Sequence, residues 1–485
     1  MKAVDQKSKS DLISAGFNEN STLSTAESLE FRWKNLCEKY LPLLSENQIW
    51  RFNRERKPQD AEQGWKLHVS ATILTAGTVL EKVASFLQKE DAYFKAPALL
   101  AYLKRINSGI YYDYSQIGKF ITVYPQNNKQ AVYFAERLHQ LTFQIPAPAI
   151  PYDQRFKPES CVYYRYGAFR ENKIKQPDGT FVFAMRDPDG NLVPDLRDSA
   201  EPYPAWVVNP FPEKKSKSAV ADSPFKKIRI IRALSQRGKG GVYQGIDFSD
   251  AEPRLCLIKE GRKNGEVSWD GRDGYWRVRH EESVIKKLGE CGLDMPQIYN
   301  SFQSEENYYL ITEFIAGENL HGFLRKCERL LTLPIGLKYA IRITEIMLKI
   351  HSAGWLWRDC KPENLIVTPD GNVRVIDFEG ACPIANADPL LWGTLTTNSP
   401  RLYEKFFSKS AMTPDMYALG AVIYLLFEGE LPAADGNFIP KFSRADIPAE
   451  IKELISKLLD LRETRNCKAS EVLDKLQKAF RTQAA

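Results

Sequence analysis

Apolar and polar residues follow two different rhythms along the first part of the chain. Lys66–Thr75 and Lys119–Tyr124 alternate between the two kinds, which predicts strands, whereas Val79–Leu87 and Gln130–Leu141 show the apolar spacing of helices. Strands interleaved with helices are typical of an α+β domain, which we expect over residues 31–200.

Three further segments follow from the same pattern. Residues 1–30 are polar, which predicts a flexible N-terminus. Residues 201–227 are rich in proline, serine and lysine, which predicts a linker. In residues 228–485 the strand patterns come first and the helical patterns follow, so we expect a second domain there.

Composition narrows the class of protein. Of the 485 residues, 43% are hydrophobic and 26% are charged, which excludes a disordered or fibrous chain. The net charge is only +6 without a long basic run, so we expect no nucleic-acid partner. The longest apolar stretch, Tyr417–Phe427, is shorter than the roughly 20 residues that span a bilayer, which predicts no membrane span.

The cysteines and the start of the chain bear on location. The eight cysteines are scattered without a C-x-x-C pair, which indicates reduced thiols and no zinc site. The first residues lack the apolar segment of a signal peptide. We therefore predict a cytoplasmic protein.

The strongest chemical signal is the sequence Asp359-Cys-Lys361-Pro-Glu-Asn364, followed downstream by Asp377-Phe-Glu-Gly. The intervening strand, turn and strand predict a hairpin that brings these residues together. Phosphoryl transfer needs a carboxylate to orient the attacking hydroxyl, a lysine at the γ-phosphate, and an amide with a second carboxylate to hold Mg²⁺. We assign these roles to Asp359, to Lys361, and to Asn364 with Asp377.

This pattern resembles the Ser/Thr protein kinases over residues 228–485 and implies their two-lobed fold, with ATP or another nucleoside triphosphate and Mg²⁺ as cofactors. The resemblance assigns Lys259 to the α- and β-phosphates and Glu281 to the lysine's ion pair, with Glu282 as the alternative register. In the glycine-rich loop only Gly240 falls on a family glycine, while Lys239 adds positive charge near the phosphates.

Three other departures mark the kinase as divergent, and one of them is Glu379, which replaces the usual small or polar residue before Gly380. Trp357 replaces the histidine that precedes Arg-Asp in the family, and Arg401 replaces a glutamate of the activation segment. In the family this glutamate pairs with a late structural arginine, whose place Arg465 takes here. Two arginines cannot form that buried ion pair, so we expect a different anchor for the activation segment. The phosphate- and metal-handling groups outside the glycine loop are retained, which predicts an active kinase.

The first region carries a second set of polar residues. Lys66 and His68 point to the same face of a predicted strand, and Lys95, Lys119 and Arg165 follow in order. Taken singly, a strand lysine is commonly a solvated edge residue, and an arginine among tyrosines is often a stacking contact.

Followed by a kinase, the stretches W-K-L-H (65–68), G-K-F-I-T-V-Y-P (118–125) and Y-Y-R-Y-G-A-F (163–169) resemble the phosphothreonine lyases and the lyase domain of class III and IV lanthipeptide synthetases. The resemblance implies β-elimination of phosphate without a metal. Lys95 is then the base, His68 the acid, and Lys66, Lys119 and Arg165 the phosphate-binding residues. Lys95 must be neutral to act, which requires burial or nearby cations to lower its pKa.

One feature departs from this pattern. The family pattern leads us to expect another arginine shortly before Gly118, and the sequence has Tyr111-Tyr112-Asp113-Tyr114 there. Phosphate binding at this place then depends on Lys119.

The two halves together predict a bifunctional dehydratase. The kinase phosphorylates Ser/Thr of a ribosomal precursor peptide with a leader, and the lyase then leaves dehydroalanine or dehydrobutyrine. No cyclase sequence follows the kinase, so we expect a product with free cysteines and separate cyclisation or tailoring enzymes. Two alternatives stay open: a divergent kinase or pseudokinase scaffold with a non-catalytic peptide-binding module, and an ordinary Ser/Thr kinase with an unrelated recognition module.

Overall fold

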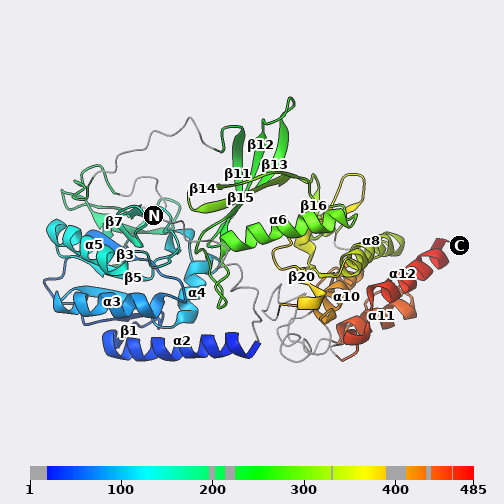
Figure 1. The fold of residues 1–485 in the computed structure, drawn as a ribbon, viewed down its shortest axis with the longest axis horizontal. Coiled ribbons are helices and arrows are strands. Elements are labelled where there is room, and N and C mark those ends of the chain that lie inside the picture. Colours follow the sequence, from blue (N-terminus) through cyan, green and yellow to red (C-terminus); the bar gives the residue numbers. More distant parts are fainter. Residues whose placement is uncertain are drawn as a thin grey trace, which may run out of the picture. The chain divides into compact units, whose positions relative to one another are not determined.

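The structure is a computed structural model with helices and strands in both halves of the chain, which confirms the predicted α+β class (Figure 1). It describes residues 19–195, 203–212, 224–328, 331–388, 411–432, 439–460 and 462–484. The chain divides into two compact units. The first comprises Met1–Pro253, Ile258–Trp276 and Phe302–Tyr309, and the second comprises Arg254–Leu257, Arg277–Ser301 and Leu310–Ala485.

A seven-stranded sheet is the centre of the N-terminal domain, and its strand order is β1-β2-β4-β5-β3-β7-β6. Its strands are β1 (Leu43–Leu44), β2 (Trp50–Phe52), β3 (Gln63–Val69), β4 (Tyr93–Pro97), β5 (Ile121–Tyr124), β6 (Gln154–Arg155) and β7 (Val162–Ala168). Neighbouring strands are antiparallel. The strand predicted over Lys66–Thr75 is shorter, because a turn closed by hydrogen bonds between Thr72 and Thr75 follows β3.

Among the described residues, the helices that accompany this sheet are α2 (Glu19–Tyr40), α3 (Ala76–Lys89), α4 (Leu100–Ser108) and α5 (Asn128–Thr142). Helix α5 starts at a capped end, since the side chain of Asn127 accepts a hydrogen bond from the backbone of Gln130. Helix α2 begins inside the segment predicted to be flexible. It is held because Trp33 and Cys37 are buried in the same hydrophobic core as Phe120.

The segment predicted as a linker also differs from expectation. The ring of Phe211 stacks on Tyr164 with centroids 3.8 Å apart, and Tyr203 packs edge-on against Trp65. Residues 203–212 therefore extend the N-terminal domain beyond residue 200, because they supply aromatic surface to its core.

A small sheet of order β10-β9-β8 follows the large one. Its strands are β8 (Asn172–Lys175), β9 (Phe181–Arg186) and β10 (Leu192–Pro194), joined by turns that contain Gly179 and Gly190. The next sheet has the order β11-β12-β13-β15-β14. Its strands are β11 (Ile228–Arg237), β12 (Gly240–Asp247), β13 (Arg254–Gly261), β14 (Ile298–Ser304) and β15 (Asn307–Glu313).

The second unit is mainly helical after α6 (Gly274–Glu290), whose residues from Arg277 onward belong to it. Its later helices are α7 (Leu320–Lys326), α8 (Leu333–Ser352), α10 (Thr413–Glu428), α11 (Ala449–Leu459) and α12 (Ala469–Ala484). The apolar stretch Tyr417–Phe427 lies in α10 and is buried throughout. Among the residues that the structure describes, we find no helix with the length and apolar character to cross a membrane.

Short strands and 3₁₀ turns connect these helices. They are β16 (Glu318–Asn319), β17 (Trp355–Leu356), β18 (Leu365–Val367), β19 (Val373–Val375), β20 (Cys382–Pro383) and η2 (Pro362–Asn364). Strands β18 and β19 form an antiparallel pair, so the predicted hairpin between the two acidic motifs is present.

Candidate functional site

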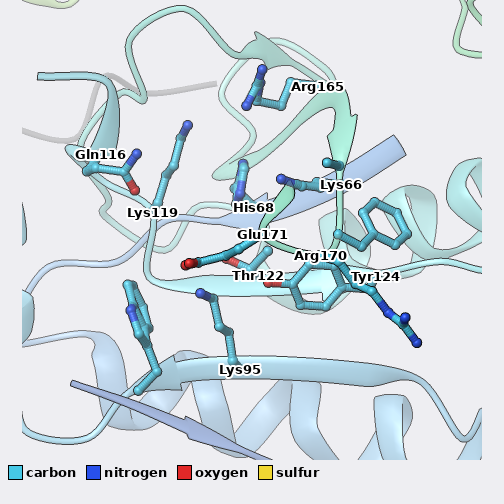
Figure 2. Close-up of a pocket in the computed structure, with 13 residues that line it drawn as sticks. Lys66, His68, Lys95, Gln116, Lys119, Thr122, Tyr124, Arg165, Arg170 and Glu171 are labelled. Atoms are coloured by element: carbon cyan, nitrogen blue, oxygen red, sulfur yellow. The ribbon is translucent and has the colours of Figure 1, made fainter. Parts of the chain in front are cut away.

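One pocket of the N-terminal domain is lined by all the polar residues that the sequence singled out there (Figure 2). They are Lys66 and His68 on β3, Lys95 on β4, Lys119 just before β5, and Arg165 on β7. The pocket has a volume of about 130 Å³.

The register of the sheet explains this gathering. Lys66 pairs with Arg165 across β3 and β7, and Thr122 on β5 pairs with both His68 and Lys95. Directly opposed residues in antiparallel strands project from the same face of the sheet. Neighbouring strands therefore place their cationic side chains side by side on one rigid surface.

Two buried carboxylates contact cationic residues of the pocket, and sequence reasoning missed both. Asp153 Oδ2 lies 2.5 Å from His68 Nδ1, and its Oδ1 lies 3.1 Å from Lys119 Nζ. Asp195 Oδ1 lies 2.7 Å from the guanidinium of Arg165. Neither carboxylate has exposed side-chain surface, so each holds its cationic partners in a fixed position.

Neither carboxylate could be found from periodicity. Asp153 lies in the loop before β6, and Asp195 follows β10, where no alternation or helical spacing points to a partner. The one available signal was composition. A buried pocket rich in cations needs buried counter-charges, but the sequence offers many aspartates for that role.

The charges of the pocket depend on one another. Burial lowers the pKa of His68 to about 4, although the charge of Asp153 opposes this, and Lys119 and Lys66 lower it further. Burial by itself raises the pKa of Asp153, but Lys119 and His68 outweigh that effect and hold this pKa well below its usual range. Near neutral pH, the pocket without a ligand thus holds a neutral His68 beside an ionised Asp153.

Other side chains line the same pocket and were not predicted: Trp50, Gln116, Thr122, Tyr124, Ala168, Phe169, Arg170 and Glu171. Arg170 does not replace the arginine expected before Gly118. Its guanidinium lies 3.0 Å from the carboxylate of Glu62, and in Figure 2 it points away from Lys66 and Lys119.

The second candidate site is the loop after β17 in the kinase domain. Asp359 Oδ2 accepts hydrogen bonds from Lys361 Nζ at 2.7 Å and from Asn364 Nδ2 at 2.8 Å. Burial raises the pKa of Asp359; Lys361 opposes the rise, and Asp377 adds to it. The structure thus brings together Asp359, Lys361 and Asn364, which the sequence assigned to one site, and Asp377 is close enough to act on Asp359 electrostatically.

The β18–β19 hairpin positions Asp377. The backbone of Ile376 donates to the carbonyl of Asn364 at 3.0 Å, so the hairpin closes directly beside the loop. Asp377 has a φ of +67°, a strained value for a residue with a side chain. Trp357 holds this strand end, because its Nε1 donates to the carbonyl of Asp377 and its ring stacks on Phe378 with centroids 5.7 Å apart.

Asp415 of helix α10 fixes the same loop through hydrogen bonds. Its Oδ1 accepts from the backbone N–H of Arg358 at 2.6 Å, and its Oδ2 accepts from that of Trp357 at 2.8 Å. His351 Nε2 contacts the same carboxylate at 3.0 Å. A buried carboxylate that accepts several hydrogen bonds can maintain the positive φ of Arg358.

An acidic cluster lies next to Asp377. Single carboxylate oxygens of Glu281, Asp377 and Glu379 come within 4.8 Å of one another. Glu281 also accepts from the backbone N–H of Phe378 at 3.1 Å, whereas Glu282 is engaged by Lys286 and Ser301. The geometry therefore favours Glu281 over Glu282 as the residue that faces this site.

The donor set fits the Mg²⁺ that the sequence implies. Carboxylate and amide oxygens are the ligands that Mg²⁺ prefers, and Asn364 with Asp377 supplies both kinds. Oδ1 of Asp359 is buried and accepts no hydrogen bond from any described residue. A buried oxygen in that state is suited to a hydrogen from a substrate hydroxyl or to a cation.

Among the predicted nucleotide-binding residues, Gly240 begins β12 and Lys259 lies on β13. A Cβ atom on Gly240 would come within 1.7 Å of the carbonyl of Glu260, so only glycine fits there. Gly238, which the sequence did not assign, is equally constrained, since its Cβ would lie 1.6 Å from the carbonyl of Asn107. Lys239 lies between these glycines, and Lys259 is half-buried on β13. Lys259 and Glu281 belong to different units, and Arg401 lies outside the described residues.

Comparison with known proteins finds a matching family model for each half of the chain. Residues 43–223 match the family described as RamC, N-terminal domain, and residues 234–476, half of the chain, match the protein kinase domain. A probable SapB synthase from Streptomyces coelicolor is 27% identical over 76% of this chain and 40% of its own length. Serine/threonine-protein kinase D from Synechocystis is 24% identical over half of each chain.

The chain thus spans half or less of the length of these curated relatives. The matches confirm the predicted resemblance to the N-terminal and kinase domains of lanthipeptide synthetases, in the predicted order. The chain belongs to the protein kinase family and carries a RamC-type domain ahead of its kinase domain.

Proposed function

We propose that this protein dehydrates Ser/Thr residues of a precursor peptide in two steps, phosphorylation by the kinase domain and β-elimination of phosphate in the N-terminal pocket. One observation carries the proposal. A kinase catalytic loop with Asp359, Lys361 and Asn364 in mutual contact shares a chain with a pocket lined by His68 and several cations.

In the first step, Asp359 orients the hydroxyl of the peptide and accepts its proton. Lys361, 2.7 Å from that carboxylate, balances the charge of the transferred phosphoryl group. Asn364 and Asp377 would hold Mg²⁺, which neutralises the nucleotide phosphates when bound. Lys259, Lys239 and the backbone at Gly240 would bind the phosphates of ATP or another nucleoside triphosphate.

In the second step, Lys66, Lys119 and Arg165 bind the phosphate group that the peptide now carries. Lys95 uses its nitrogen lone pair to take the Cα proton, and the C–H electrons become the Cα=Cβ double bond. The Cβ–O bond breaks, and His68 gives a proton to the departing oxygen. The atoms and charges of this step therefore balance. It needs no metal, because the cations stabilise the leaving phosphate.

His68 can serve as the acid only after the phosphate has bound. Burial lowers its pKa to about 4 in the pocket without a ligand, so it is neutral at physiological pH. A phosphate dianion brought beside it favours the protonated ring, and Asp153 on Nδ1 adds to this effect. The proton is then available at Nε2, the ring nitrogen that Asp153 does not engage.

The substrate is a Ser/Thr-containing precursor peptide with a leader. A relative that is named as a synthase and matches 76% of this chain supports a role in biosynthesis. Cyclisation or tailoring would then fall to other active sites, on this protein or on separate enzymes. The rival is a divergent kinase or pseudokinase whose N-terminal domain only binds a peptide. The altered glycine loop favours it, since only Gly240 matches the family pattern.

The decisive experiment uses the full chain with ATP, Mg²⁺ and a Ser/Thr-rich precursor peptide encoded beside it. Mass spectrometry over time should show a phosphopeptide first and then a product that has lost phosphoric acid. A synthetic phosphoserine version of the peptide should be converted without ATP. Phosphorylation without elimination from either peptide would reject the lyase step, and absence of any phosphate transfer would reject the kinase step.

A further inference from the structure

The side chain of Lys95 lies against an aromatic surface. Its Nζ is 4.2 Å from the ring centroid of Trp50 and 6.0 Å from that of Phe52. Both rings come from β2, which pairs with β4 so that Phe52 is opposite Lys95 and Trp50 is opposite Pro97. Trp50 also lines the pocket, whereas Phe52 does not.

Such a contact has a defined electrostatic effect. The face of an indole carries negative charge density, which attracts an ammonium group more strongly than a neutral amine, and tryptophan is the strongest aromatic residue in this respect. The effect increases in a site that excludes water, because the cation is then less solvated.

The charge of Lys95 changes during the reaction. As a neutral amine it takes the Cα proton and becomes an ammonium, so positive charge develops on Nζ in the transition state. This happens in a pocket lined by the cations Lys66, Lys119 and Arg165, which disfavour another positive charge, and by the carboxylate of Glu171, which favours it (Figure 2). A group that stabilises this developing charge accelerates proton abstraction.

We propose that Trp50 is a positioning residue for the base: its indole face fixes the amine of Lys95 and stabilises the positive charge that Lys95 acquires. This inference rests on the proposed elimination of phosphate. The covalent step is unchanged, since the new N–H bond forms on Lys95 and the broken C–H bond is that of the peptide.

The proposal predicts a pH effect that a purely structural role does not. In Trp50→Leu the ammonium form of Lys95 loses its aromatic contact, so Lys95 becomes neutral at lower pH. The acid limb is the low-pH side of the profile of kcat/KM against pH, where Lys95 is protonated. For a phosphoserine peptide this limb should shift to lower pH by about 0.5 to 1.5 pH units. The maximal rate should fall about 3- to 30-fold, because a weaker base abstracts the proton less readily.

Two matched variants separate this effect from lost packing. Trp50→Phe keeps a weaker aromatic face and should shift the limb by less than Trp50→Leu. Phe52→Leu removes the more distant ring of the same strand and should leave the limb within about 0.2 pH units of the wild type. Equal limb positions in the wild type and both Trp50 variants, with melting temperatures retained, would overturn the proposal.

A second measurement does not depend on activity. The full-length protein is treated briefly with acetic anhydride at a series of pH values, and acetylation of Lys95 is followed by peptide mass spectrometry. The midpoint should be lower in Trp50→Leu than in the wild type by the same amount as the acid limb. Identical midpoints would refute the contact's effect. A shifted midpoint in a protein that never eliminates phosphate would instead refute the proposed function while the contact stands.

Discussion

The pocket of the N-terminal domain and the catalytic loop of the kinase domain are built from opposite charges. Lys66, Lys95 and Lys119 line the pocket, while Asp377 lies with Glu281 and Glu379 in the kinase domain. Bound phosphate needs cations directly, whereas nucleotide phosphates that arrive with a metal need carboxylates to hold that metal. Under the proposed function, the sign of the charge distinguishes two ways of handling a phosphoryl group.

The two regions also differ in what holds their side chains. The pocket residues stand on adjacent strands of one sheet, where the pairing of β3 with β7 fixes Lys66 opposite Arg165. The kinase residues stand on a loop and a hairpin end, where Arg358 and Asp377 have positive φ values. Asp415 and Trp357 hold this loop by hydrogen bonds, which replace the support that a sheet provides.

The largest expected effect separates the acidic site from the cationic one. Asp377→Asn should reduce phosphorylation of the precursor peptide on the order of 10³-fold, because it weakens the hold on the metal. Elimination from a pre-phosphorylated peptide should proceed at the wild-type rate. Phosphate transfer near the wild-type rate, measured with labelled ATP, would contradict the kinase assignment.

Lys95→Ala and His68→Ala test the cationic pocket. Each should slow elimination about 10²- to 10³-fold, since each removes a proton-transfer group, while phosphorylation continues. Phosphopeptide should accumulate in mass spectra, and a pre-phosphorylated peptide should stay unreacted. Lys89→Ala, at the exposed end of α3, is the control lysine. Unchanged dehydration in both pocket variants would leave only a kinase.

Asp153→Asn should have a smaller effect in the same pocket. The charge of Asp153 raises the pKa of His68 against the effect of burial, so its removal lowers that pKa further. Elimination should slow about 10- to 100-fold, and the alkaline limb of the rate profile should move to lower pH. A rate loss without a shift of that limb would show that Asp153 acts only through packing.

The smallest expected effect concerns acid stability. The pKa of His68 is about 4 in the folded protein and near 6.5 when unfolded, so the unfolded chain binds the proton first as pH falls from 6.5 to 4. The free energy of unfolding should fall in that window by up to about 3 kcal/mol. Asp153 contributes in a different window: its folded pKa is depressed, so its stabilisation is lost only at lower pH.

His68→Gln tests this, because glutamine does not titrate. Hydrogen–deuterium exchange of peptides from β3, compared at pH 7 and pH 5 after correction for intrinsic rates, should show a smaller loss of protection in the variant than in the wild type. An equal loss would assign the acid sensitivity to other groups.

Much of both sites follows from local pattern. The alternation around Lys66 and His68 predicts a strand with both side chains on one face, and the turn residues between Asn364 and Asp377 predict a hairpin. Both features are present in the structure. Such features depend on backbone periodicity and turn chemistry, which act over a few residues.

The remaining features depend on contacts between distant segments. Asp153 reaches His68 across 85 positions of the sequence, and Phe211 extends the N-terminal domain by stacking on Tyr164. Helix α2 is held because it buries Trp33 against Phe120. No local signal encodes these pairings, because burial and charge neutralisation are settled only when the whole core has formed.

The sequence by itself therefore determined which residues are the candidates for handling phosphate, on which strand or hairpin they stand, and that a cationic set precedes an acidic one. Only the tertiary structure decided that Asp153 and Asp195 neutralise the pocket, that Glu281 rather than Glu282 faces Asp377, and that Trp50 covers Lys95. The physical reason is the sequence distance over which the interactions act. Local patterns place a side chain on one face of an element, whereas its protonation and orientation depend on neighbours from distant parts of the chain.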